Sequence, residues 1–234
     1  HKDVRLPVMV NFDGFIISHG VEVVETLDDE LIKNFVGKQE KIYPLLDTSN
    51  PVTYGSIDMY DYYFEHKRQQ VEAMKHVPRV FKEIAEEFAK ISGRKYDLVD
   101  EYMLDDAEYV MIALGSTAGT IKHTINELRK EGKKVGLLKP WMFRPFSKEE
   151  YQRLLTGRKA VVVLDRSASF GAEAPLYQSV KSAIYEVASK PQMGSYVYGL
   201  GGRDITPHHI RQAFEDAFNG NLIVDEERYL GLRE

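Results

Sequence analysis

The sequence contains no cysteine, which excludes disulfides, thiolate zinc sites, cysteine nucleophiles and cysteine-ligated iron–sulfur clusters within this chain. It has no apolar run of the roughly 18 residues that a membrane-spanning helix needs, and no apolar signal-peptide region near its start. An excess of basic residues is also absent, because 36 acidic side chains face 31 basic ones and the formal net charge is −5. We therefore expect a cytoplasmic protein that binds neither nucleic acid nor a membrane.

The second half of the chain alternates short apolar runs with amphipathic segments, and 43% of all 234 residues are hydrophobic. The hydrophobic pattern predicts strands over residues 109–114, 135–138, 160–164 and 196–198, with helices over 119–130, 147–155, 175–188 and 205–218. Ser147 and Glu150 have the spacing of a capping box, and Thr206 precedes a helix that starts with Pro207. Four strand–helix units predict an α/β domain with a doubly wound, mostly parallel sheet over residues 105–220.

The first half of the chain is less regular. The apolar run Leu6–Asn11 favours a buried strand of a parallel sheet. A single strand needs partners, so it either joins the downstream sheet or belongs to a chain that is the C-terminal piece of something longer, which we favour. Residues 21–104 are expected to form a connector with a short helix over 29–35 and a long amphipathic helical stretch over 59–91. Pro78 predicts a kink or two abutting helices there, and Ser92-Gly93 a stop.

Two further segments of the sequence are distinctive. Aromatic residues and a methionine gather around the start of the long helical stretch and predict either a subunit interface or the core of that helix. They are Tyr54, Met59, Tyr60, Tyr62, Tyr63 and Phe64. The final segment, residues 221–234, is polar and acidic, and we expect it to wrap a neighbour or to fray.

Residues suited to binding follow several predicted strands, where open α/β sheets place their ligand crevice. The small residues of Leu114–Thr120 either offer backbone N–H groups to an anion or form a tight strand-to-helix turn. Asp165 and Arg166 either pair with each other or bind a carboxylate. The glycines of Tyr198–Asp204 are typical of a packing turn or of a phosphate cradle.

Other polar residues give weaker indications. Asn11–Phe15 and Ser18-His19 follow the first predicted strand and so occupy another crevice position. Ser18 and His19 are neighbours in sequence, which does not place a base on a hydroxyl. The seven histidines lack metal-ligand spacing, and the adjacent His208 and His209 would point about 100° apart on a helix. These residues by themselves do not name a reaction.

Seven segments, in order along the chain, resemble the α subunit of 2-oxoacid:ferredoxin oxidoreductases, with the pyruvate-type branch (pyruvate synthase) as the nearest match. They are Leu6–Phe15 with Ser18-His19, Tyr54–Asp58, Asp105–Val110, Gly115–Thr120, Phe143–Ser147, Val163–Arg166 and Gly199–Asp204. The resemblance implies oxidative decarboxylation of pyruvate or a related 2-oxoacid to an acyl-CoA and CO2, with electrons passed to ferredoxin. It implies thiamine diphosphate with Mg²⁺ and iron–sulfur clusters in the complete complex, and none bound by this chain alone.

The same resemblance implies an organisation for the chain. Residues 1–20 would be the end of a pyrimidine-binding thiamine domain that is mostly missing, 21–104 a connector, 105–220 a transketolase C-terminal-like domain and 221–234 a tail. The expected partners are subunits of β, γ and δ type, with ferredoxin and CoA reached through the complex. No residue is assigned to catalysis, cofactor binding or metal binding. We interpret the loops at 115–120, 165–166 and 199–204 mainly as interface or packing elements.

Three alternatives stay open at this point. Lys139–Met142 departs from the basic and aliphatic residues expected before the Arg-Pro-Phe segment, so an oxalate- or other 2-oxoacid-specific relative is one. A non-catalytic α/β interaction module is the second, because no complete catalytic constellation is present. The third is a nucleotide- or CoA-binding protein that uses the glycine-rich turns as an anion site.

Overall fold

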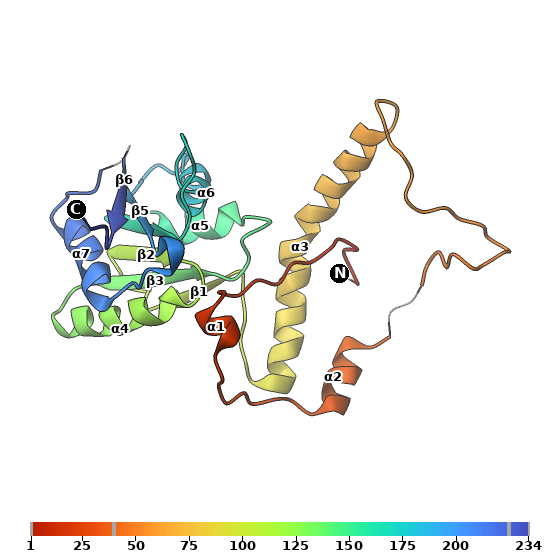
Figure 1. Ribbon diagram of the computed structural model, residues 1–234, viewed down its shortest axis with the longest axis horizontal. Coiled ribbons are helices and arrows are strands. Elements are labelled where there is room, and N and C mark those ends of the chain that lie inside the picture. Colours follow the sequence, from red (N-terminus) through yellow and green to blue (C-terminus); the bar gives the residue numbers. More distant parts are fainter. Residues whose placement is uncertain (1, 39–40, 224–225, 234) are drawn as a thin grey trace. The chain divides into compact units, whose positions relative to one another are not determined.

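The computed structural model describes residues 2–38, 41–223 and 226–233, and divides into two compact units (Figure 1). Unit 1 contains the residues up to Asn11 together with His19–Lys95. Unit 2 contains Phe12–Ser18 and the residues from Tyr96 onward. A short stretch between two parts of unit 1 thus belongs to unit 2.

Unit 2 is built on a six-stranded sheet with the order β1-β3-β2-β4-β5-β6. Its strands are β1 (Val99–Tyr102), β2 (Tyr109–Ala113), β3 (Val135–Pro140), β4 (Ala160–Asp165), β5 (Gln192–Tyr198) and β6 (Glu227–Leu230). All neighbouring pairs are parallel except β1 with β3. This is the doubly wound, mostly parallel sheet that the sequence predicts.

Helices cover both faces of this sheet (Figure 1). The helices α4 (Thr117–Lys130) and α7 (Pro207–Phe218) pack on one face, and α5 (Lys148–Leu155) and α6 (Pro175–Ala183) on the other. The central strands supply side chains to both layers, since successive residues of a strand point to opposite faces. In β4, for example, Val161 and Val163 enter the α5/α6 layer, whereas Val162 and Leu164 enter the α4/α7 layer. A strand buried on both faces needs the continuous apolar run from which it was predicted.

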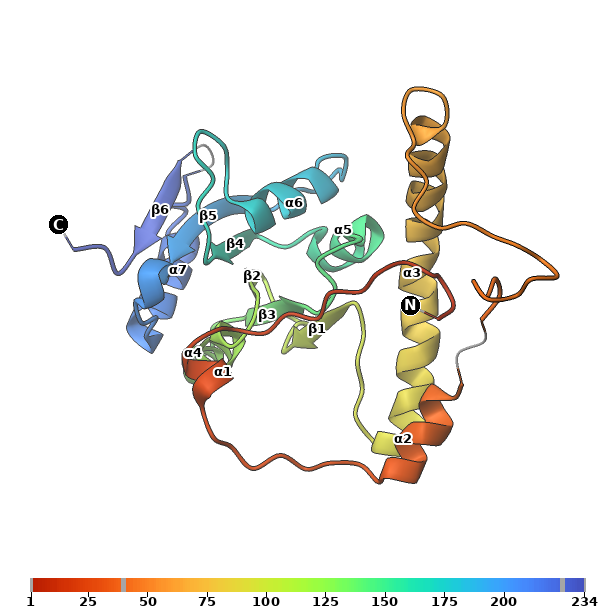
Figure 2. The ribbon, with the colours of Figure 1, turned by 45° about the vertical axis from the view of Figure 1, so that its right-hand side comes forward.

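Two helices, joined by long irregular segments, occur in the described part of unit 1. Helix α2 (Asp29–Val36) begins at Asp28, whose carboxylate accepts hydrogen bonds from the N–H groups of Glu30 and Leu31. It lies beside the C-terminal part of α3 (Tyr63–Ser92), where Phe35 meets Phe88 with ring centroids 5.5 Å apart (Figures 1 and 2). Both helices match the expected positions.

Helix α3 continues through Pro78 as one 30-residue helix, so the expectation of two abutting helices is wrong. Proline removes one backbone hydrogen bond. Ion pairs between side chains four residues apart lie on either side of Pro78, where Arg68 binds Glu72 and Arg79 binds Glu83. The helix ends at Gly93, which has a left-handed φ of 69°. Among the described residues of α2 and α3, only Ala85 is buried.

The strand expected over Leu6–Asn11 is not formed. These residues have no regular secondary structure, and Val8, Met9 and Val10 are 67%, 82% and 86% exposed. A strand needs a neighbour for its N–H and C=O groups, and no strand lies among the described residues of unit 1. The hydrophobic pattern of a strand is present, but the described residues of unit 1 contain no neighbouring strand for it to join.

Three other details differ from the sequence predictions. The side chain of Ser147 makes no capping hydrogen bond, and the Glu150 carboxylate pairs with Arg153 at 2.9 Å. Helix α6 stops at Ala183, whose carbonyl accepts a hydrogen bond from Gln152 at 3.0 Å. Part of the acidic tail forms β6 instead of fraying; the tail positions 224–225 and 234 lie outside the described residues.

No helix in the described ranges is long and apolar enough to cross a bilayer.

Candidate functional site

The loops that follow β2, β4 and β5 meet at the carboxyl edge of the sheet, and the segment 12–18 docks there (Figures 1 and 2). The Asp13 carboxylate accepts a hydrogen bond from the backbone N–H of Ser116, at 2.6 Å. Ser116 immediately precedes α4, so the carboxylate lies at a helix N-terminus, where the helix dipole favours a negative charge. The anion at this turn is therefore supplied by the chain itself.

Gly115 allows this close approach. Its φ is 67°, and a Cβ atom built there would lie 2.6 Å from Oδ1 of Asp13. Burial alone would raise the pKa of Asp13. The hydrogen bonds from the side chain and backbone of Ser116, with the positive charges of Arg166 and Lys139, outweigh burial and hold that pKa below its ordinary value of 3.8. Asp13 is thus an ionised carboxylate at neutral pH.

Arg166 follows β4 and lies on the same side of the edge. Its guanidinium is 5.5 Å from the centroid of the Tyr198 ring. The Tyr198 hydroxyl is 2.7 Å from the hydroxyl of Thr117 in the first turn of α4. A Cβ at Gly199, where φ is 65°, would lie 2.6 Å from Nε of Arg166. The two turns at Gly115 and Gly199 therefore leave room for the side chains of Asp13 and Arg166.

Asp165 points to the opposite face of the sheet, so it does not pair with Arg166. Its carboxylate accepts hydrogen bonds from the N–H groups of Leu176 at 2.9 Å and Tyr177 at 3.0 Å, at the start of α6. Burial raises the pKa of Asp165, and the two N–H donors oppose that rise. The residue fixes α6 onto the end of β4, which is a structural role.

The remaining crevice residues act in packing. Arg203, after the turn Leu200–Gly202, donates a hydrogen bond to the carbonyl of Gly231 at 2.7 Å. The ring of His209 accepts a hydrogen bond from the backbone N–H of Thr206, which caps the start of α7. Ser18 donates to the carbonyl of Phe15 within the same short segment. Across the described ranges, no group of three or more His, Asp or Glu side chains has metal-binding geometry.

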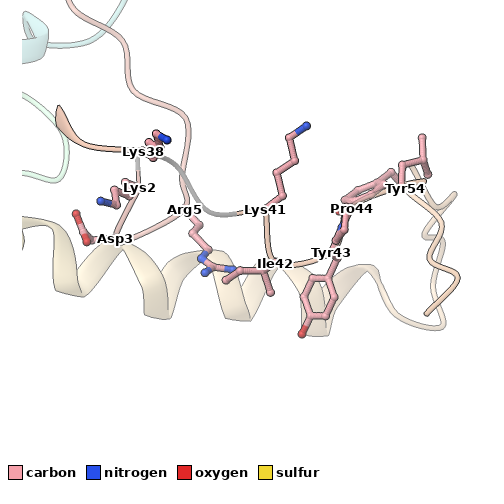
Figure 3. Close-up of a pocket in the computed structure, with 10 residues that line it drawn as sticks. Lys2, Asp3, Arg5, Lys38, Lys41, Ile42, Tyr43, Pro44 and Tyr54 are labelled. Atoms are coloured by element: carbon pink, nitrogen blue, oxygen red, sulfur yellow. Dashed lines mark hydrogen bonds between the residues drawn. The ribbon is translucent and has the colours of Figure 1, made fainter. Parts of the chain in front are cut away.

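Unit 1 holds an open cavity of about 910 Å³ (Figure 3). It is lined by residues from two stretches of chain and by Tyr54; they are Lys2, Asp3, Arg5, Lys38, Lys41, Ile42, Tyr43, Pro44 and Leu45. Four of these side chains are cationic, but Lys41 extends away from the others (Figure 3). The Tyr54 hydroxyl donates to the carbonyl of Tyr43, which closes one end of this stretch. The lining is exposed and offers no enclosed site.

Sequence reasoning did not identify the docking of Asp13, which lies 103 positions from its partner Ser116. The Asp13-Gly14 dipeptide by itself is typical of a turn and gives no sign of this contact. The aromatic group before α3 is exposed, with Tyr60 at 98% and Phe64 at 80%. The core alternative for that group is therefore wrong within this chain, and the interface alternative stays a prediction.

The described fold is thus an open α/β domain whose carboxyl edge is organised around a docked carboxylate, with a helical unit beside it in sequence. Two family models match this chain. Residues 107–210 match "Pyruvate:ferredoxin oxidoreductase core domain II". Residues 1–86 match "Pyruvate flavodoxin/ferredoxin oxidoreductase, thiamine diP-bdg".

Curated relatives give the same result. "Pyruvate synthase subunit PorA" of Thermotoga maritima is 70% identical over 234 residues, which is 100% of this chain and 60% of the relative. The protein of the same name from Pyrococcus furiosus is 35% identical over 233 residues, covering 98% of this chain and 59% of the relative. "Ketoisovalerate oxidoreductase subunit VorA" of Pyrococcus abyssi is 36% identical over 216 residues, which cover 92% of this chain and 55% of the relative. The chain belongs to the family of 2-oxoacid:ferredoxin oxidoreductase α subunits.

The chain spans about 60% of the length of these pyruvate synthase subunits. Among solved structures, one similar chain is "2-oxoglutarate:ferredoxin oxidoreductase from Magnetococcus marinus with 2-oxoglutarate, coenzyme A and succinyl-CoA bound". Its TM-score is 0.49 at 18% identity, with 74% of this chain and 28% of that chain covered.

The residues present do not fit thiamine diphosphate by themselves. Holding its diphosphate through Mg²⁺ needs clustered oxygen ligands, and the described residues contain no such acidic group. Its rings need an apolar cleft, whereas the apolar side chains of Leu6–Asn11 and of the segment before α3 are mostly exposed. The described residues therefore form no complete site for that cofactor.

Proposed function

We propose that this chain forms part of the α subunit of a thiamine-diphosphate-dependent complex that oxidises pyruvate. The reaction is the oxidative decarboxylation of pyruvate to an acyl-CoA and CO2, with the electrons passed to ferredoxin. The observation that carries the proposal is the 70% identity, over every residue of the chain, to a pyruvate synthase subunit. A branched 2-oxoacid is the second candidate substrate, because a ketoisovalerate oxidoreductase subunit is 36% identical.

In this proposal the chain mainly supports and assembles the complex. Thiamine diphosphate, Mg²⁺ and the iron–sulfur clusters belong to the complete complex; the absence of cysteine in this sequence supports placing the clusters on other chains. We assign residues 1–20 to the end of a thiamine-binding domain and 21–95 to a connector. The α/β domain extends beyond the expected bounds of 105–220, because its sheet includes β1 and β6. The protein works in the cytoplasm in contact with β-, γ- and δ-type subunits.

The direct test is an activity assay on the native complex that carries this chain, purified without oxygen. Reduction of a viologen dye is followed with pyruvate, 3-methyl-2-oxobutanoate, 2-oxoglutarate and oxalate, each with and without CoA. We expect reduction that depends on both pyruvate and CoA. Preference for another acid would refute the pyruvate assignment alone. A complex that holds its cofactors and reduces no dye with any 2-oxoacid would favour a non-catalytic interaction module.

A further inference from the structure

The carboxyl edge of the sheet in unit 2 carries an exposed apolar side chain after each of four parallel strands. They are Trp141 after β3, Leu114 after β2, Phe170 after β4 and Leu200 after β5, with exposures of 46%, 37%, 104% and 48%. Since the carboxyl ends of neighbouring parallel strands lie at one edge, these side chains belong to one surface. We call these four residues the apolar rim. Single exposed apolar residues are common, so the apolar rim counts as a candidate interaction site only together with the charges around it.

Phe170 is the most prominent member of the rim. It lies in the tight turn Ser169–Ala172, which is closed by a bridge between its end residues and contains Gly171 with φ of 76°. The loop between β4 and α6 projects from the sheet (Figure 2). A fully exposed phenyl ring on a narrow turn is a convex feature. It suits insertion into a pocket on another surface and cannot enclose a small molecule by itself.

Cations flank the apolar rim. Lys139, Arg144 and Arg166 each lie over an aromatic ring, at 4.1 Å from Trp141, 4.1 Å from Phe143 and 5.5 Å from Tyr198. Elsewhere in the described chain, lysines and arginines commonly form ion pairs with carboxylates, as Arg129 does with Asp106. These three make no such pair with a described residue. Stacking on a ring orients a guanidinium while leaving N–H donors available.

The charge at this edge is opposite to that of the whole chain, which carries −5. Of the nearby carboxylates, Asp13 accepts a hydrogen bond from Ser116 and is also attracted by Arg166 and Lys139, Glu173 pairs with Lys181, and Asp165 is buried against α6. Asp204 is the exposed carboxylate in the described part of these loops. The exposed charge that remains is mainly positive.

We propose that the apolar rim and its three cations dock an acidic polypeptide surface on another subunit, with Phe170 entering an apolar pocket ringed by carboxylates. The inference rests on the proposed function, because it needs a complex with other subunits. Charge complementarity sets the sign of the partner, since carboxylates form bidentate pairs with arginine. The large aromatic side chain and the arginine are the residue types that dominate such interfaces.

The test uses the complete subunit assembled with its partner subunits, and compares two substitutions with two matched controls. The substitutions are Phe170→Ser and Arg166→Glu. The controls are Tyr185→Ser and Lys190→Glu, because Lys190 lies 4.6 Å from the ring of the exposed Tyr185, near the amino end of β5. The side chains of Phe170, Tyr185 and Lys190 are exposed, so we expect the Tm of these three variants to stay within about 2 °C of the wild type. Arg166→Glu also places a second carboxylate near Asp13, so we expect a lower Tm for it, and its association is measured at a temperature where it is fully folded.

We expect each edge variant to weaken association at least about tenfold, measured as the dissociation constant at low salt. The controls should bind like the wild type. Wild-type affinity should fall as NaCl is raised from 0.05 to 0.5 M, and the salt dependence should be smaller for Arg166→Glu. Unchanged affinity in both edge variants, or equal loss in the controls, would overturn the inference. So would salt-independent binding, because it excludes an acidic partner.

Two further readouts separate the possible failures. Dye reduction by the wild-type complex with a 2-oxoacid tests the proposed function, whatever the variants do. Protection of the loops after β2 and β4 from amide exchange by 1 mM inorganic diphosphate, in the subunit without partners, would assign this edge to a small anion and overturn the polypeptide partner. Edge variants that keep the wild-type Tm but no longer assemble support the inference. If one edge variant has a lowered Tm, the association measured for the other edge variant decides.

Discussion

The carboxylate of Asp13 holds the segment 12–18 on the α/β domain, and replacing it with asparagine isolates the effect of its charge. The amide keeps the shape and still accepts a hydrogen bond from Ser116, but it loses the attraction to the start of α4 and to Arg166. An anion at a helix N-terminus contributes about 0.3–1 kcal/mol when exposed and up to about 2 kcal/mol when partly buried. Asp13 is half-buried, so we expect a loss of about 1 kcal/mol, or about fivefold in the docking equilibrium.

Amide hydrogen exchange measures this equilibrium directly. The N–H of Ser116 is protected by the Asp13 carboxylate, so its exchange rate should rise about fivefold in Asp13→Asn and further in Asp13→Ala. Asp47→Asn is the matched control, because the Asp47 carboxylate also accepts a hydrogen bond from a serine N–H, that of Ser49, at 3.0 Å. That contact is local to unit 1, and the exchange of Ser116 should not change.

The pH dependence gives a second measure of the same contact. The folded pKa of Asp13 is held below its ordinary value of 3.8. The contribution of Asp13 is therefore fully present above about pH 4–5 and is lost as the pH falls through the folded pKa. Exchange at Ser116, corrected for its intrinsic rate, should lose protection in acid in the wild type, and this step should be absent in Asp13→Asn. Equal protection of Ser116 in both proteins at pH 7 would refute the reasoning.

Three shorter predictions concern other residues. Gly115→Ala should lower the free energy of unfolding by more than about 1 kcal/mol, since the added Cβ would lie 2.6 Å from Asp13 at a residue with positive φ. Gly119→Ala, within α4 and with open space around the added Cβ, should raise it by about 0.5–1 kcal/mol. Denaturant titration of both variants measures the difference. Burial raises the pKa of Asp165 above its ordinary value of 3.8, so the folded state loses stability as the pH rises from that ordinary value through the raised pKa. Asp165→Asn should remove this pH dependence from Tm measured between pH 4 and 8. Phe64→Ser should change the stability of the free subunit by less than about 0.5 kcal/mol, because the ring is 80% exposed, yet weaken assembly in a pull-down if the aromatic group is an interface.

The alternation of apolar runs and amphipathic segments was sufficient to predict the α/β domain, because each central strand is buried on both faces. The run Val161–Leu164 is entirely apolar, and every one of its side chains is buried. The edge strands β1 and β6 were missed for the opposite reason. Their sequences, Val99–Tyr102 and Glu227–Leu230, include charged residues that an edge position tolerates.

The candidate site was predictable in its location and not in its contacts. Open α/β sheets bind at the carboxyl edge, and this rule selected the turns at 114–120, 165–166 and 198–204. The predicted strand ends at residue 164, whereas β4 continues to Asp165; only with that extension does the alternation of side chains direct Asp165 toward α6 and away from Arg166. The contact of Asp13 with Ser116 joins residues 103 positions apart, and no local pattern encodes it.

The interruption of unit 1 by the segment 12–18 has a consequence for how this domain can be exchanged between proteins. The chain crosses from one unit to the other three times, at residues 11–12, 18–19 and 95–96. Splicing at the last crossing alone would transfer every strand of the sheet while leaving behind the aspartate that covers the turn before α4. A splice at 95–96 would therefore leave the turn before α4 without its anion, whereas a splice at 11–12 would carry Asp13 together with the sheet.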